Sequence, residues 1–103
     1  MTDPRIGAFL VERYVSPAAA SGLALSVAGL AQQCADARTD GVRYLQSAYL
    51  PADDTCFCLF SASTAHAVTA INERAGFAFD RITGAVILRP YHRPTPPDQR
   101  KSS

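Results

Sequence analysis

The sequence predicts an α+β domain in which a four-stranded antiparallel sheet carries two helices on one face. Three observations lead to this prediction. Segments rich in β-branched and aromatic residues alternate with helical segments in the order strand, helix, strand, strand, helix, strand. The two middle strands lie within 42–60 and are joined by a short turn at 51–54. Three of the four strands are apolar on both faces, so the sheet needs cover on both sides.

The first half of the chain predicts one strand and one helix. Residues 6–15 favour a strand, whose alternation separates one face, Ala8, Leu10, Glu12 and Tyr14, from the other, Phe9, Val11, Arg13 and Val15. Ser16 as N-cap and Pro17 in the first turn predict a helix that runs to about Arg38 and ends at 39–41. Its expected buried stripe is Leu23, Val27, Leu30 and Cys34.

The second half predicts a hairpin, a helix and a last strand. In the strand 42–50, simple alternation places Tyr44, Gln46 and Ala48 on one face, and in the strand 55–61 it groups Cys56, Cys58 and Phe60. A second helix is expected from an N-cap at Ser63 to Gly76, with Ala67, Val68 and Ile71 facing inward. The last strand is expected at 80–89. Residues 1–89 then form one domain, and 90–103 a flexible, proline-rich, basic tail.

This order of elements is that of the ferredoxin-like βαββαβ fold, in which the first and third strands are central. Two helices cover only one face of such a sheet, and the uncovered face would expose a large apolar patch. We therefore expect a homodimer in which two sheets face each other, a dimeric α/β barrel.

The composition excludes several classes of function. A net charge of +1 over 103 residues argues against a nucleic-acid or anionic-membrane partner. No apolar run reaches the roughly 18 residues that span a bilayer, and the acidic N-terminus is unlike a signal peptide. An odd number of cysteines, three, does not form a disulfide framework. These features predict a cytoplasmic protein with reduced thiols.

Three residues are candidate metal ligands or catalytic groups. Glu12 is a carboxylate within an apolar strand, where burial would make it a ligand or a general base; the alternative is an ion pair with Arg43 or Arg81. Cys56 and Cys58 share a face at a strand repeat of roughly 7 Å, which suits two thiolates on one metal, although core packing is the commoner role of free cysteine. Tyr14, Tyr44 and Gln46 are expected to line the inter-sheet cavity. His66 and His92 are expected on the surface.

The segments 9–15, 41–60 and 72–82 resemble a small ferredoxin-like family that is catalogued as a domain of unknown function and often labelled nickel-binding. The resemblance implies a dimer and, in some members, a bound divalent metal. Glu12, Arg13, Tyr44, Cys56 and Cys58 stand at matching positions. Gln46, Ser61 and Ile71 stand where many members carry His, Glu and His, and losing these groups would remove most of a nickel site.

Three interpretations of function follow. The first is a small dimeric cytoplasmic binding protein that holds a divalent metal such as nickel, or a small ligand, in or near the inter-sheet cavity, with Glu12, Cys56 and Cys58 as metal ligands. The second is a cofactor-free dimeric α/β-barrel enzyme, monooxygenase-like or isomerase-like, that uses Glu12. The third is an interaction module without a ligand. A binding protein is favoured over an enzyme because no complete catalytic motif is present.

Overall fold

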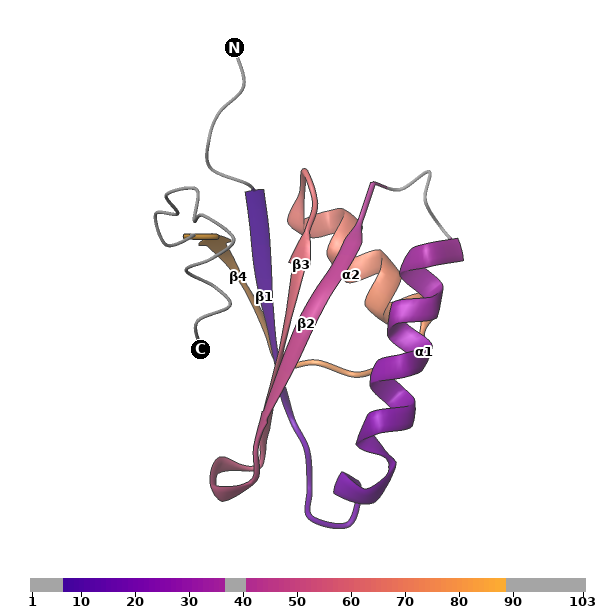
Figure 1. The fold of residues 1–103 in the computed structure, drawn as a ribbon, viewed down its shortest axis with the longest axis vertical. Coiled ribbons are helices and arrows are strands. Elements are labelled where there is room, and N and C mark those ends of the chain that lie inside the picture. The colour runs from indigo at the N-terminus through magenta and orange to yellow at the C-terminus, as the bar shows by residue number, and fades with distance from the viewer. Residues whose placement is uncertain (1–6, 37–40, 89–103) are drawn as a thin grey trace, which may run out of the picture.

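The structure, a computed structural model, describes residues 7–36 and 41–88 (Figure 1). Its helices and strands follow in the order β1 Gly7–Tyr14, α1 Leu23–Asp36, β2 Arg43–Leu50, β3 Thr55–Ser61, α2 Ala65–Arg74 and β4 Arg81–Val86. Short 3-10 helices precede α1, at Ala20–Gly22, and follow β2, at Pro51–Asp53. This is the predicted element order.

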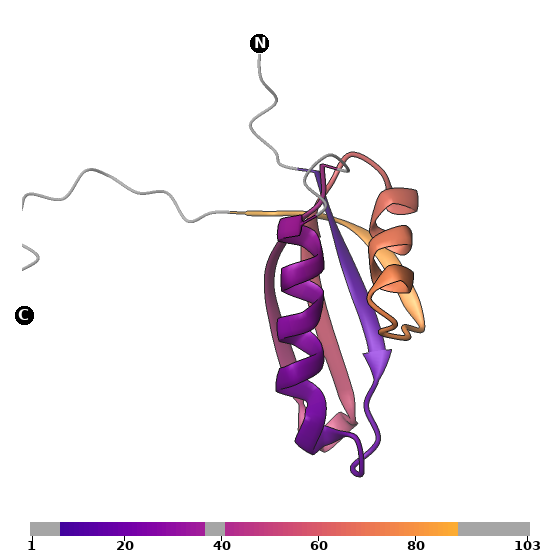
Figure 2. The same ribbon diagram turned by 90° about the vertical axis from the view of Figure 1, so that its right-hand side faces the viewer.

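The four strands form one antiparallel sheet in the order β2-β3-β1-β4. The central positions of β1 and β3 confirm the ferredoxin-like prediction. Both helices lie on the same side of the sheet, α1 over β2 and α2 toward β4 (Figure 2). The other side carries neither helix, and it is called the open face below.

The hydrophobic core lies between the sheet and the helices. Alternation along β1 was predicted correctly, because Val11 and Val15 are buried against the helices while Leu10 and Tyr14 belong to the open face. Helix α1 contributes Leu23, Leu30 and Cys34 to this core, and α2 contributes Val68 and Ile71. The other buried members of this core are Val42, just before β2, and Cys56, Cys58, Phe60 and Ala62 from β3 and its flank.

The prediction that Tyr44 shares a face of β2 with Gln46 and Ala48 is wrong, because the strand contains a β-bulge. Tyr44 pairs with Phe60, but the next paired residue is Gln46, opposite Leu59, which leaves Leu45 as the extra residue. The bulge shifts the alternation by one position. Tyr44 therefore faces the helices together with Ser47 and Tyr49, whereas Gln46 and Ala48 lie on the open face.

The helix starts also differ from prediction. The hydroxyl of Ser16 accepts a hydrogen bond from the Ala19 amide at 3.2 Å, as a cap would, but the following residues form a turn and a 3-10 helix before α1 begins at Leu23. The N-cap of α2 is Thr64, whose hydroxyl accepts from the Ala67 amide, and not Ser63.

The predicted end of α2 agrees with the structure, whereas that of β4 does not. Gly76 follows α2 with φ +70°, the left-handed conformation that glycine favours. Strand β4 ends at Val86, earlier than predicted. The predicted end of the first helix and the tail at 90–103 lie outside the described residues. Within the described ranges, no helix is long and apolar enough to cross a membrane.

Candidate functional site

The open face of the sheet combines apolar side chains with one charged pair. Glu12 lies in the middle of β1, opposite Phe57 of β3 and Arg81 of β4. Its Oε1 is 3.3 Å from Arg81 Nη2, and the two side chains are 35% and 70% exposed. The ion pair that the sequence suggested for Glu12 is therefore present, with Arg81 rather than Arg43 as the partner.

Apolar groups surround this pair. Leu10 and Leu59 are directly opposite each other on the two central strands, and they and Phe57 are only partly buried. Tyr14 at the end of β1 is 63% exposed, and Leu50 on the edge strand is also exposed. Since no helix covers these residues, the open face presents several partly exposed apolar side chains beside Glu12 and Arg81.

The two cysteines of β3 lie on the opposite side of the sheet from Glu12. Cys56 is 1% exposed and Cys58 is fully buried, both in the layer between sheet and helices. Their Sγ atoms are 3.9 Å apart, closer than the roughly 7 Å expected from an ideal strand repeat, because the side chains lean toward each other. Burial, and then the neighbouring Cys58, raise the pKa of Cys56 to about 11.

A hydrogen-bonded chain continues from the cysteines to the sheet edge. The hydroxyl of Ser47 donates to Cys58 Sγ at 2.9 Å, and Ser47 Oγ and the Tyr44 hydroxyl are 2.8 Å apart. The ring of Tyr44 packs edge-on against Phe60 at 5.8 Å between centroids. Tyr44 therefore belongs to the buried layer, not to the inter-sheet surface where it was expected.

Arg13 is a buried cation that sequence reasoning did not single out as a site residue. Its side chain is 1% exposed, its Cζ lies 3.7 Å from the centroid of the Phe77 ring, and Nη1 donates to the carbonyls of Phe77 and Ala78 at 3.0 and 3.2 Å. Nη2 donates to Asn72 Oδ1 at 2.8 Å, while Nε is buried without a hydrogen-bond partner. The available signal was its place on the same face of β1 as Val11 and Val15.

The expected metal ligands do not meet within one subunit. Glu12 points to the open face, and Cys56 and Cys58 point to the helices, so the sheet separates them. Tyr14 and Gln46 are on the open face as expected. Among residues 7–36 and 41–88, no group of three His, Cys, Asp or Glu side chains is placed to hold a metal ion. His66 is exposed in the first turn of α2, and His92 lies outside the described residues.

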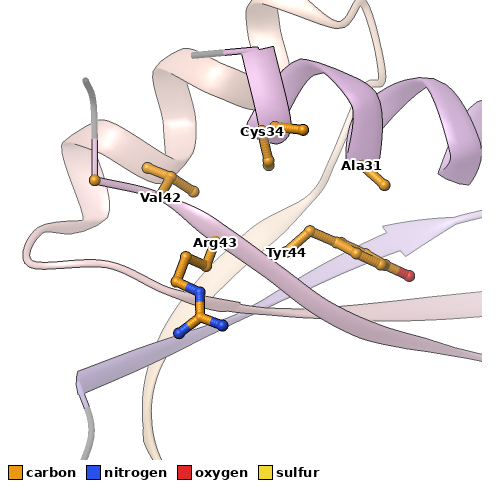
Figure 3. A pocket seen from close by; sticks show the side chains of 7 residues that line it. Ala31, Cys34, Val42, Arg43 and Tyr44 are labelled. Atoms are coloured by element: carbon orange, nitrogen blue, oxygen red, sulfur yellow. The ribbon is translucent and has the colours of Figure 1, made fainter. Parts of the chain in front are cut away.

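A separate pocket of about 530 Å³ lies between α1 and the beginning of β2 (Figure 3). Ala31 and Cys34 line it from the helix, and Val42 and Tyr44 line it from the strand, whereas the side chain of Arg43 points to the other side of β2. Burial raises the pKa of the Cys34 thiol, an effect that a hydrogen bond from the Tyr44 backbone partly offsets. The lining is thus apolar with one protonated thiol.

Comparison with known proteins identifies the family. Residues 9–84 match the family model described as nickel responsive protein SCO4226-like. The crystal structure of SCO4226 from Streptomyces coelicolor A3(2) aligns with a TM-score of 0.58 at 24% sequence identity, over 74% of this chain and 91% of that chain, and supports the fold. No curated protein matches. The match of the family model over most of the chain confirms the resemblance seen in the sequence, and the chain belongs to the family described as nickel responsive protein SCO4226-like.

Proposed function

We propose that this chain is a small homodimeric binding protein of the cytoplasm, in which the open faces of two sheets pack together and hold a small ligand beside Glu12 and Arg81. The observation that carries the proposal is the apolar open face, where Leu10, Phe57 and Leu59 remain partly exposed on strands at the centre of the sheet. Burial stabilises apolar area by about 25 cal/mol per Å², so a matching surface on a second copy would cover it favourably.

The ligand follows from the chemistry of this surface. The carboxylate of Glu12 offers hydrogen-bond acceptors, and the guanidinium of Arg81 offers donors. The residue opposite Glu12 on β3 is apolar, Phe57. Pockets for small molecules have this character, a mostly apolar lining with a few polar groups that fix orientation. A small, largely apolar molecule with one polar or charged group is the ligand class that fits.

Nickel fits the described residues poorly. The family description concerns nickel, and Ni²⁺ is held by imidazole, carboxylate or thiolate groups. On the open face Glu12 supplies one carboxylate, already paired with Arg81, while Gln46 and Ser61 supply neutral oxygens. Ile71 is fully buried in the core. A divalent metal would need both copies of Glu12 across the dimer interface, so metal binding is an outcome to be tested rather than the first proposal.

The cytoplasmic location is supported by the three cysteines. Cys34, Cys56 and Cys58 are all free and buried, as in a reducing compartment.

The enzymatic alternative has less support. An isomerase-like or monooxygenase-like reaction would use Glu12 to take up a proton. Its ion pair with Arg81 occupies the carboxylate that this step would need, so the geometry favours binding over catalysis.

The dimer is tested by changing an apolar residue of the open face. Light scattering coupled to gel filtration should give a dimeric mass for the wild-type protein and a monomeric mass for Leu59→Glu, because a buried carboxylate would oppose association. Leu25→Glu is the matched control, since Leu25 is an apolar residue on α1 that is 79% exposed. A monomeric wild type, or dissociation by both variants alike, would contradict the proposed interface.

The ligand site is tested with an apolar fluorescent anion, anilinonaphthalene sulfonate, and with Ni²⁺. The wild-type dimer should bind the dye, and Arg81→Gln should bind it more weakly while remaining a dimer. Retention of Ni²⁺ that is lost in Glu12→Gln would instead support a metal site. If the dimer binds neither probe, the inter-sheet space is filled by side chains and the chain is an interaction module.

A further inference from the structure

A buried pair of thiols lies beside a buried cation whose charge is not balanced by a carboxylate. Cys56 is opposite Arg13 in the β1–β3 register, and both side chains are 1% exposed. The guanidinium donates only to two carbonyls and to the amide oxygen of Asn72. Within the described part of the chain it forms no ion pair. An isolated buried charge is unfavourable, and a nearby anion would stabilise it.

The spacing of the two sulfurs is already that of two ligands on one metal. Sulfurs bound at about 2.3 Å to a common ion lie roughly 3.8 to 4.6 Å apart for angles between tetrahedral and linear. Cys56 Sγ and Cys58 Sγ are 3.9 Å apart. This separation is near the tetrahedral end of the range, so a linear two-coordinate ion would need the sulfurs to move apart by about 0.7 Å, which side-chain rotation can supply. A disulfide would instead require them to approach to about 2.05 Å.

The charge balance selects a monovalent ion. Two thiolates with one monovalent cation carry a net charge of −1, which the adjacent Arg13 neutralises. Two thiolates with a divalent cation are neutral and would leave Arg13 uncompensated. A divalent ion such as Ni²⁺ or Zn²⁺ would also need further ligands, and the described residues offer no third His, Cys, Asp or Glu beside the pair.

We infer that Cys56 and Cys58 form a two-coordinate site for a soft monovalent ion, Cu(I), with Arg13 as the compensating charge and Ser47 as a positioning residue. Thiolates favour soft ions, and among these Cu(I) is the monovalent one and accepts two ligands. The Ser47 hydroxyl donates to Cys58 Sγ at 2.9 Å, a hydrogen bond that stabilises charge on this sulfur. Binding converts two thiols and Cu(I) into a bis-thiolate complex and releases two protons, with no change of oxidation state.

This site is independent of the proposed ligand site on the open face. The sheet separates the thiols from Glu12, and the thiols belong to the layer that the helices cover. Because both sulfurs are buried, a metal ion enters only when the helix layer opens transiently, so binding must be followed to equilibrium. Leu59→Glu, which tests the dimer, should leave Cu(I) binding intact, and the two proposals can therefore fail separately.

The test is an anaerobic titration of the reduced, metal-free full chain with Cu(I) in competition with bicinchoninate. The wild-type protein should withdraw one equivalent of Cu(I) per subunit from the coloured complex. Cys56→Ser and Cys58→Ser should each lose this equivalent. Cys34→Ser is the matched control, since Cys34 is also a buried thiol but lies on α1, and it should retain full binding.

X-ray absorption of the loaded wild-type protein tests the site without any substitution. It should show Cu(I) with two sulfur neighbours. Failure to withdraw copper, equal binding by all three serine variants, or a shell of nitrogen and oxygen ligands would overturn the inference. Stoichiometric retention of Ni²⁺ that is lost in Cys56→Ser and Cys58→Ser would overturn the selection of a monovalent ion.

Discussion

Arg13 on β1 and Asn72 on α2 are joined by a buried hydrogen bond of 2.8 Å, although they are 59 residues apart in the sequence. Asn72 is fully buried, and its Nδ2 donates to the Val68 carbonyl at 2.8 Å, so the amide links the arginine to the helix. This pair fixes α2 against the central strand. It also holds the guanidinium in place beside Cys56.

Replacing Asn72 with alanine should therefore destabilise the protein by about 3 kcal/mol, because it leaves a buried charged donor without its acceptor. Urea denaturation followed by circular dichroism would measure the change. Ser26→Ala, at an exposed position of α1, should change the free energy of unfolding by less than about 0.5 kcal/mol.

Asn72→Asp separates the contact of Asn72 with Arg13 from its contact with Val68 in the same experiment. The carboxylate can still accept from Arg13 and supplies a counter-charge, but it cannot donate to Val68. We expect a smaller loss than in Asn72→Ala. A greater loss would mean that placing a carboxylate against the Val68 carbonyl costs more than the counter-charge to Arg13 contributes.

The ion pair between Glu12 and Arg81 should contribute little to stability. The side chains of Glu12 and Arg81 are 35% and 70% exposed. Exposed ion pairs of this kind contribute about 0 to 1 kcal/mol to stability. A double-mutant cycle with Glu12→Gln and Arg81→Gln, measured by urea denaturation at low salt, should give a coupling within that range. A much larger coupling would show that the pair is desolvated in the dimer.

The sequence predicted the faces of β1 correctly but those of β2 only in part, and the difference has a physical cause. Strand β1 pairs regularly on both sides, so simple alternation separates Val11 from Leu10. Strand β2 inserts Leu45 as an extra residue, and such a bulge is a property of the pairing between β2 and β3, which alternation within one strand does not show. Alternation therefore grouped Tyr44 with Gln46 and Ala48, whereas the bulge places it with Ser47 and Tyr49.

The candidate site was harder to predict than the fold. The partner of Glu12, Arg81, was one of the two arginines named from the sequence. The environment of Arg13 depends on Asn72 and on the carbonyls of residues 77 and 78, which reach it only through tertiary packing. The 3.9 Å between the thiols likewise depends on side-chain rotation, which strand spacing does not determine.

Deleting Leu45 should leave the fold intact. Without this residue Gln46 follows Tyr44 directly, and every later residue of β2 keeps the face it has now. Deleting Ser47 is the contrasting change, because a regular strand would then place Gln46 opposite Cys58 in the buried layer, and burying an unpaired amide costs about 1 to 3 kcal/mol. Thermal unfolding should show a clearly lower midpoint for the Ser47 deletion, and equal midpoints would contradict the register.

The stability of the metal-free protein should decrease in alkaline solution partly through Cys34. Burial raises the pKa of this thiol in the folded state, so above about pH 8.5 the unfolded chain loses a proton that the folded chain retains. The unfolded state then binds fewer protons, and the free energy of unfolding falls as the pH rises. Urea denaturation of the wild type and Cys34→Ala at pH 7 and pH 10 would measure this: the wild type should lose more stability between the two pH values than the variant. Parallel losses would show that the Cys34 thiol is not desolvated by the fold.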